Sequence, residues 1–276
     1  MRAWSPRFWS GKILAGLLIA VSLVFLALVL VIPVASVLGY ALSKGLDVFA
    51  DALRRPDTIE AIKLTLMTAA IVVPLNTIFG IGAAWSITKF DFRGKQLMIS
   101  LIDLPFSLSP VIAGLVFILL FGAQGGFGPW LQERGIAIVF AFPGIVLATL
   151  LVTFPYVARE LIPIMQMQGR AAEEAAVSLG AGGWMTFFRV TLPGIRWALL
   201  YGVILCNARA MGEFGAVAVV SGHIRGLTTT MPLQVEIMYN EYDLVGAFAV
   251  ASLLMMLAVI SLVAKLVFEA LASRAH

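Results

Sequence analysis

Charged residues are scarce in this sequence. Of its 276 residues, 12% are charged and 61% are hydrophobic, whereas soluble domains carry about 25% charged residues. A chain of this composition has too little polar surface to cover itself in water. The sequence therefore predicts an integral membrane protein, embedded in a lipid bilayer.

Cysteine and histidine are also rare. The single cysteine, Cys206, excludes an internal disulfide and most thiolate metal sites. The two histidines, His223 and His276, lie far apart in the sequence and lack the local spacing of a zinc site. We therefore expect this chain to bind no metal and no cofactor of its own.

The basic residues form no cluster. The formal net charge is +4, but the lysines and arginines are scattered, without a basic stripe interleaved with aromatic residues. We therefore expect no nucleic-acid partner. A phosphate-binding loop of the pattern Gly-x-x-x-x-Gly-Lys-Ser/Thr is also absent, so the chain is not an ATPase of that pattern.

An intramembrane enzyme fits the sequence poorly. Aspartyl types need paired aspartates, but Asp103 is the only aspartate within a long apolar run. Serine types need a base such as histidine beside the nucleophile, and His223 lies only at the edge of such a run. The pattern favours transport over catalysis.

Six apolar runs have about the length of 20 residues that a spanning helix needs. They cover residues 13–39, 64–88, 96–122, 136–158, 197–220 and 244–264. The first run is longer than the apolar core of a cleaved signal peptide. The sequence therefore predicts an all-α membrane protein with six transmembrane helices, which form a single domain over residues 1–276.

The distribution of lysine and arginine predicts the orientation. If the N-terminus is inside, the inner segments hold twice as many basic residues as the outer ones. By the positive-inside rule, both termini are then cytoplasmic. The same topology places the hydrophilic segment between the fourth and fifth runs, about residues 159–194, in the cytoplasm.

This hydrophilic segment predicts a compact knob of two short helices. Residues 165–179 are rich in alanine and favour a helix, and Gly180 is a natural helix stop. A second helix over residues 184–190 is expected to end before Pro193. Such a knob can enter a groove on a partner. An ordinary helical hairpin between two spans is the alternative.

The fifth run contains two charged residues, Arg209 and Glu213. They are four residues apart, so they share a helix face and can pair. Each charge at the centre of a span costs roughly 2.5–3.5 kcal/mol on insertion scales. The pair is therefore either a structural bridge or part of a polar path, and both interpretations stay open. Gly212 and Gly215 would let helices approach closely.

The spacing of the hydrophilic segment resembles the cytoplasmic coupling loop of bacterial ABC importer permeases. The family pattern is E-A-A, three residues, G, nine residues, an aliphatic residue, any residue, then L-P. The matching residues are Glu174, Ala175, Ala176, Gly180, Leu192 and Pro193. Val190 replaces the commoner isoleucine. The resemblance implies that these residues receive the work of ATP hydrolysis from a separate ATPase subunit.

Further stretches are similar to the sulfate/thiosulfate importer permeases, in particular to their CysW-type members. These stretches are residues 102–110, 207–217, 219–226, 231–233 and 236–242. Molybdate and tungstate permeases share an R-x-x-G-E-F/Y-G core, so those oxyanions stay alternative substrates. An ion-coupled carrier acting alone is a further alternative, but it would leave the coupling loop without a purpose.

The resemblance implies an ABC type I importer permease bundle that moves sulfate or thiosulfate across the bacterial cytoplasmic membrane. The implied partners are two copies of an ATPase subunit, which hold ATP and Mg²⁺, a second homologous permease, and a periplasmic or extracellular sulfate-binding protein. The implied translocation residues are Arg209, Gly212, Glu213, Phe214 and Gly215. The expected outer-side contacts are Ser221, His223 and Arg225. Arg209 is the better candidate for contact with the anion, because a carboxylate would repel it.

Overall fold

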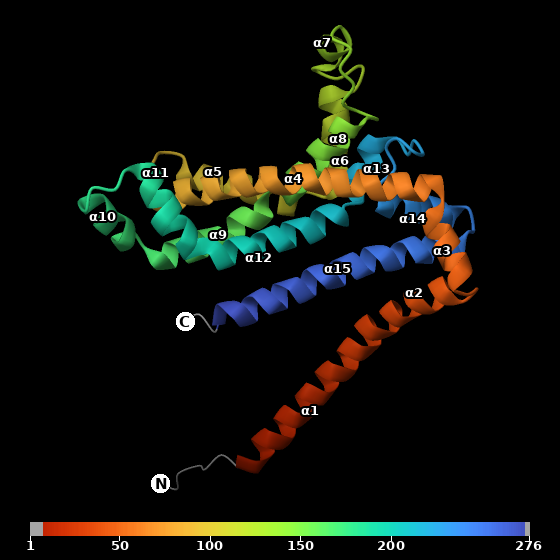
Figure 1. Cartoon of the computed structure of the whole chain (residues 1–276), viewed down its shortest axis with the longest axis horizontal. Coiled ribbons are helices and arrows are strands. Elements are labelled where there is room, and N and C mark those ends of the chain that lie inside the picture. Colours follow the sequence, from red (N-terminus) through yellow and green to blue (C-terminus); the bar gives the residue numbers. More distant parts are fainter. Residues whose placement is uncertain (1–7, 274–276) are drawn as a thin grey trace, which may run out of the picture.

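The computed structural model describes residues 8–273, and every regular element in this range is a helix (Figure 1). In chain order these are α1 (Phe8–Leu26), the π-helix η1 (Ala27–Val31), α2 (Ile32–Leu42), α3 (Leu46–Arg54), α4 (Pro56–Lys89), α5 (Lys95–Ser107), α6 (Pro110–Phe121), α7 (Gly128–Gln132), α8 (Phe142–Thr153), α9 (Pro155–Gln168), α10 (Ala171–Ser178), α11 (Gly183–Thr186), the π-helix η2 (Phe187–Thr191), α12 (Leu192–Met211), α13 (Gly215–Ser221), α14 (Met231–Asn240) and α15 (Leu244–Ser273). The prediction that both chain ends are cytoplasmic concerns residues 1–7 and 274–276, which lie outside the described range.

Within residues 8–273, five helical segments are long and apolar enough to cross a membrane, or up to six if the bent pair α5–α6 is one span. The five are Leu14–Leu42, Pro56–Lys89, Phe142–Gln168, Gly183–Met211 and Leu244–Ala264. The predicted class, an all-helical protein with several apolar spans, is therefore confirmed. The second and sixth predicted runs lie within α4 and α15.

The third predicted run, residues 96–122, is not one continuous helix. It forms α5 and α6, which are bent by 108°. Leu108 and Ser109 take extended backbone conformations between the two helices. Pro110 follows them in the first turn of α6, and a residue before proline disfavours the helical conformation. The sequence Ser109-Pro110 therefore disfavours a continuous helix at this point.

The fourth and fifth predicted runs have wrong boundaries. The fourth helix begins at Phe142, not at residue 136, and continues through Pro155 to the end of α9. The fifth segment runs from Gly183 to Met211 instead of spanning residues 197–220. Gly212 follows the last residue of α12, and the chain restarts as the separate helix α13.

The core of the bundle lies where α4, α9 and α12 pack together. Ala84, Val157, Leu161 and Cys206 are fully buried in one cluster between these helices. The helices approach closely because Gly80 of α4 has no side chain, and a Cβ atom there would lie 2.7 Å from the Cβ of Val157.

The long helices run along the long axis of the molecule (Figure 1). The first helix of the chain, α1, diverges from the others, and the adjoining α2 packs on α15 through the stacked rings of Tyr40 and Phe248. The described start of α1 and the described end of α15 both lie toward the left of the view, as do α10 and α11. Three segments far apart in the sequence therefore share one end of the bundle.

Candidate functional site

The hydrophilic segment forms a helical hairpin at one end of the bundle. Residues 165–179 do not form the single helix that the alanine content predicts, because Gly169 takes a positive φ of 65° and separates α9 from α10. Gly180 has a φ of 89° and ends the helical turn as predicted. Without a Cβ atom, both glycines adopt this backbone conformation at no steric cost.

The return arm of the hairpin continues into the bundle. The expected stop at Pro193 is wrong, since α11, η2 and α12 form one helical segment from Gly183 onward. Pro193 lies in the first turn of α12. The π-helical turn η2, Phe187–Thr191, precedes it, and such irregular turns accommodate a proline within a longer helical segment.

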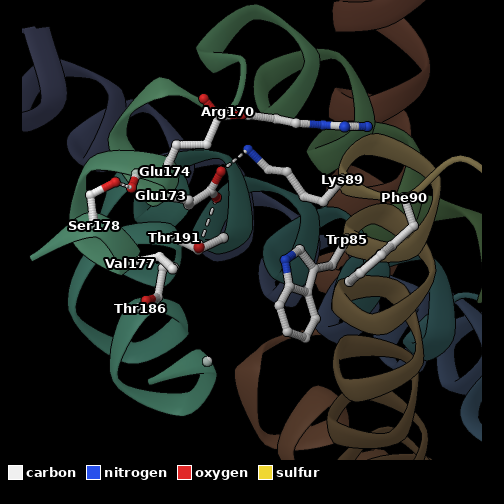
Figure 2. Close-up of a pocket in the computed structure, with 11 residues that line it drawn as sticks. Trp85, Lys89, Phe90, Arg170, Glu173, Glu174, Val177, Ser178, Thr186 and Thr191 are labelled. Atoms are coloured by element: carbon white, nitrogen blue, oxygen red, sulfur yellow. Dashed lines mark hydrogen bonds and ion pairs between the residues drawn. The ribbon is translucent and has the colours of Figure 1, made fainter. Parts of the chain in front are cut away.

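The hairpin is tied to the bundle through Glu173 (Figure 2). Lys89 Nζ, at the end of α4, lies 2.7 Å from Glu173 Oε2. The hydroxyl of Thr191, in η2, donates to Glu173 Oε1 at 2.8 Å. Lys89 also donates to the carbonyl of Gly169, at the break between α9 and α10. One carboxylate therefore links α10 to two core helices.

Three residues of the predicted coupling motif directly follow Glu173 in α10: Glu174, Ala175 and Ala176. Glu174 and Ala175 are exposed, and Ala176 is half-buried. The Glu174 carboxylate makes no hydrogen bond or ion pair with any described residue. Large apolar side chains are also exposed on the hairpin: Val177, Leu179, Trp184, Met185 and Phe188. Val177 and Leu179 lie before the candidate span Gly183–Met211, and exposed apolar side chains outside the spanning helices are typical of a protein-binding site.

A cavity of about 460 Å³ opens between the end of α4 and the hairpin (Figure 2). Its aromatic wall comes from Trp85 and Phe90 of the α4 end. Beside it, Arg170 pairs with Asp91 at 3.2 Å. The hydrogen bond from Lys95, followed by that from Arg170, holds the pKa of Asp91 below its ordinary value. Asp91 is exposed, so solvent screens this second link between the same elements.

The two charged residues of the fifth run form the expected pair. Arg209 Nη1 lies 2.7 Å from Glu213 Oε2, and the side chains are 30% and 1% exposed. The other carboxylate oxygen, Glu213 Oε1, accepts the N–H of Ala216 at 2.9 Å. Glu213 therefore caps α13 and neutralises Arg209 at the break between α12 and α13. A role of the pair in a transport path stays a prediction.

The other predicted path residues cluster at the same break. Gly212 lines a cavity of about 310 Å³ between α12, the start of α14 and α15. Gly215 packs on α6, where a Cβ atom would lie 3.0 Å from the Cβ of Pro110. Phe214 is 42% exposed. The structure thus brings these residues together at one interruption in the bundle.

The predicted outer-side residues behave differently from one another. Ser221 is fully buried and accepts the N–H of His223 at 3.2 Å, so it offers no surface to a partner in this conformation. His223 Nε2 lies 3.1 Å from Glu236 Oε2. Arg225 pairs with Glu241. A contact between a histidine and a carboxylate and one ion pair therefore hold this loop against α14 and the residue that follows it.

A sequence model identifies the family. The model of the "Binding-protein-dependent transport system inner membrane component" matches residues 76–276, which is more than half of the chain. The chain belongs to this family. The assignment suggested by the spacing of the hydrophilic segment is therefore confirmed.

Curated members of this family are similar to the chain over most of its length. It is 52% identical to the "Sulfate transport system permease protein CysW" of Escherichia coli (strain K12), over 86% of this chain and 81% of that protein. It is 51% identical to the CysW protein of Synechococcus elongatus, over 89% and 86%. Its identity with the CysT sulfate permease of Escherichia coli (strain K12) is 33%, over 82% of each.

A solved structure shares the fold of this family member. It is the crystal structure of a bacterial alginate ABC transporter in complex with an alginate-pentasaccharide-bound periplasmic protein. The TM-score is 0.76 and the sequence identity 17%, over 98% of both chains. The likeness in fold covers nearly the whole length of both chains.

Sequence reasoning missed three residues of the site in this family member. Glu173 precedes the motif directly, Thr191 lies within it, and Lys89 directly follows the second apolar run. Asp103, the aspartate within the third apolar run, pairs with Arg159 at 3.2 Å. The sequence shows a lysine at the end of a span and a glutamate beside the motif. These positions alone do not predict that the two side chains contact each other.

Proposed function

We propose that this chain is the permease subunit of an ATP-driven importer that moves sulfate or thiosulfate across the bacterial cytoplasmic membrane. The observation that carries the proposal is the 52% identity with a sulfate permease over 86% of the chain. The chain has no phosphate-binding loop of the pattern Gly-x-x-x-x-Gly-Lys-Ser/Thr, so a separate ATPase subunit hydrolyses the ATP and holds its Mg²⁺.

The proposed topology has six spans, with the bent pair α5–α6 counted as one. Both chain ends and the α10–η2 hairpin are cytoplasmic. Two observations support it: the excess of basic residues in the segments that this topology places inside, and the common end of the bundle shared by α1, α15 and the hairpin (Figure 1). The chain forms one transmembrane domain, with the coupling loop at about residues 159–194.

The hairpin is the proposed docking site of the ATPase subunit. Its exposed apolar side chains, led by Leu179 at 89% and Trp184 at 76% exposure, would face water unless a partner covers them. The Glu174 carboxylate has no hydrogen-bond or ion-pair partner among residues 8–273 and can pair with a cation of the ATPase subunit. A short helix with one apolar face suits a groove on another protein.

The break between α12 and α13 is the proposed part of the transport path. Arg209 is 30% exposed while its partner Glu213 is 1% exposed, so the cation is the more accessible member of the pair. In a low-dielectric environment, an accessible guanidinium attracts a dianion over several ångströms. Gly212 at the adjacent cavity adds backbone that a small oxyanion can approach.

The proposed complex contains two permeases, two ATPase copies and a sulfate-binding protein. A relative of 33% identity that is itself named as a sulfate permease supports a homologous second permease. His223 and Arg225 are 39% and 47% exposed in the loop between α13 and α14. This loop lies toward the right of Figure 1, away from the hairpin, where the proposed topology places the binding protein. The predicted contact at Ser221 is left out of this proposal because the side chain is buried.

Uptake by a reconstituted complex tests the function. The complex is placed in vesicles with ATP inside the lumen that corresponds to the cytoplasm, and labelled sulfate is added with the binding protein. We expect sulfate accumulation that needs ATP and persists when an ionophore abolishes ion gradients. Uptake of molybdate or tungstate in preference to sulfate, or uptake driven by an ion gradient without ATP, would overturn the proposal.

A further inference from the structure

We propose that Glu173, held by Lys89 and Thr191, is the joint through which movement of α10 reaches the transmembrane helices. The inference rests on the proposed function, since it concerns how the hairpin transmits work. It assigns a positioning role to three residues. Only Thr191 lies within the motif that relates the hairpin to importer permeases, and it occupies a position where that motif accepts any residue.

The helix α10 has little other attachment to the bundle. It spans eight residues, and none of its side chains is fully buried. It is bounded on both sides by glycines of positive φ, Gly169 and Gly180, and open space surrounds the position of a Cβ atom at each. Hydrophobic packing therefore attaches α10 only weakly to the core helices. The Glu173 contacts add a polar attachment to the end of α4 and to η2.

The joint reaches two helices of the central core. Lys89 is the last residue of α4, and Thr191 directly precedes α12. Both helices pack with α9 around the cluster that contains Ala84 and Ile195. A displacement of α10 that carries Glu173 with it must therefore move the ends of α4 and α12 or break the two contacts.

Burial makes this joint stronger than its neighbour on the surface. The side chains of Lys89 and Glu173 are 7% and 18% exposed, whereas those of Arg170 and Asp91 are 44% and 78% exposed. Charges at the same separation attract more strongly when water is excluded, while exposed pairs contribute little. The two pairs connect the same regions, so they form a matched comparison.

The adjacent glutamates have separate tasks in this arrangement. Glu173 faces inward and contacts the core helices, while Glu174 is exposed and free for a partner (Figure 2). One residue receives the movement of the ATPase subunit, and its neighbour passes that movement on. Loss of Glu173 should therefore uncouple ATP hydrolysis from transport without preventing the ATPase subunit from binding.

The experiment uses the whole complex and compares the number of sulfate ions imported per ATP hydrolysed. The test variant is the double substitution Lys89→Met with Glu173→Gln, which removes both charges and leaves neither one buried alone. The control is Arg170→Gln with Asp91→Asn at the exposed pair. We expect the test variant to lower the ratio several-fold and the control to leave it nearly unchanged.

Two outcomes would overturn the proposal. The first is an unchanged ratio in the test variant, and the second is an equal fall of the ratio in the control. The wild-type complex is measured in the same assay. If it imports sulfate, the proposed function holds, and either result then counts against the joint alone. If the test variant assembles poorly, spin labels at Arg93 and Ser178 measure the joint directly in a Glu173→Gln complex. The distance distribution should broaden, and an unchanged distribution would contradict the joint.

Discussion

Arg209 Nη1 lies 2.7 Å from Glu213 Oε2, and this ion pair spans the break between α12 and α13. The second oxygen of the same carboxylate accepts the N–H of Ala216 at 2.9 Å. Glu213 therefore has an electrostatic contact and a capping contact at once. Substitutions that remove one contact or both can separate their contributions.

The capping contact predicts a difference between two substitutions of Glu213. Glu213→Gln keeps an oxygen that accepts the N–H of Ala216, whereas Glu213→Ala leaves that buried N–H without a partner. We expect the alanine variant to be less stable than the glutamine variant by about 1–3 kcal/mol. Thermal unfolding of the two purified complexes measures this difference. Equal stability would contradict the capping role.

The ion pair predicts that Arg209→Ala impairs sulfate uptake more than Arg196→Ala, an exposed arginine on the same helix. Removing Arg209 leaves the buried Glu213 carboxylate uncompensated. Because Arg209 is 30% exposed, we expect a smaller loss of stability than the about 3–5 kcal/mol seen when a fully buried pair is broken. Uptake and thermal unfolding of both variants check the comparison, and equal uptake would remove Arg209 from the path.

The double variant Arg209→Ala with Glu213→Gln separates the two interpretations of the pair. It leaves no unpaired charge and keeps an oxygen that accepts the N–H of Ala216, so part of the stability lost in Arg209→Ala should return. If uptake stays low while stability recovers, Arg209 acts on the anion, as the proposed path requires. If uptake recovers together with stability, the pair is a structural bridge only.

The close approach of α4 and α9 predicts opposite effects at two glycines of α4. In Gly80→Ala the new Cβ would lie 2.7 Å from the Cβ of Val157, whereas at Gly82 nothing lies within 4 Å. We expect Gly80→Ala to destabilise the protein by about 1–3 kcal/mol. Gly82→Ala should be neutral or slightly stabilising, because alanine favours helices. Unfolding midpoints in detergent measure both, and a stable Gly80→Ala variant would contradict the packing.

The hairpin predicts the effect of Glu174→Ala combined with Gly180→Ala. Glu174 has no internal partner among the described residues, and alanine at a φ of 89° costs roughly 1–2 kcal/mol locally. We expect normal membrane insertion and strongly reduced sulfate uptake. The exposed Glu133 in the loop after α7 provides a control, since Glu133→Ala should transport normally. Wild-type uptake in the double variant would reject the coupling role of these residues.

The Asp91 contacts predict a pH dependence that lies outside the physiological range. The pKa of Asp91 is lowered from its ordinary value of 3.8 by the contacts with Lys95 and Arg170. Because its pKa is lowered by folding, ionised Asp91 stabilises the folded protein at pH values above its ordinary pKa. This stabilisation is lost as the pH falls through the pKa of Asp91 in the folded state. Asp91→Asn should therefore leave the pH profile of uptake between about pH 6 and 8 unchanged. A shift of that profile would contradict the assignment.

The apolar runs made the helical class and most spans predictable, because lipid-facing helices need uninterrupted apolar sequence. The break at Ser109-Pro110 had a local signal that the hydropathy of the run concealed. The break after Met211 had weaker signals, since Gly212 and Glu213 read equally well as residues of one helix. Its position follows from the cap that Glu213 provides to α13.

The motif made the hairpin predictable but not its attachment. Gly180 was recognised as a helix stop, while Gly169 was not, because the surrounding alanine-rich sequence favours a continuous helix. The contact between Lys89 and Glu173 joins residues 84 positions apart. Only the packing of α4 against α9 brings them together, and no local pattern records it.

The cytoplasmic position of the hairpin is the central claim, because ATP-driven movement can enter the chain there only if the hairpin faces the ATPase subunit. A cysteine at the exposed Ser178, in a Cys206→Ser background, reports this position through a membrane-impermeant thiol reagent. We expect labelling in inside-out vesicles and none in intact cells. Labelling of Ser178→Cys in intact cells would place the hairpin outside and contradict the account.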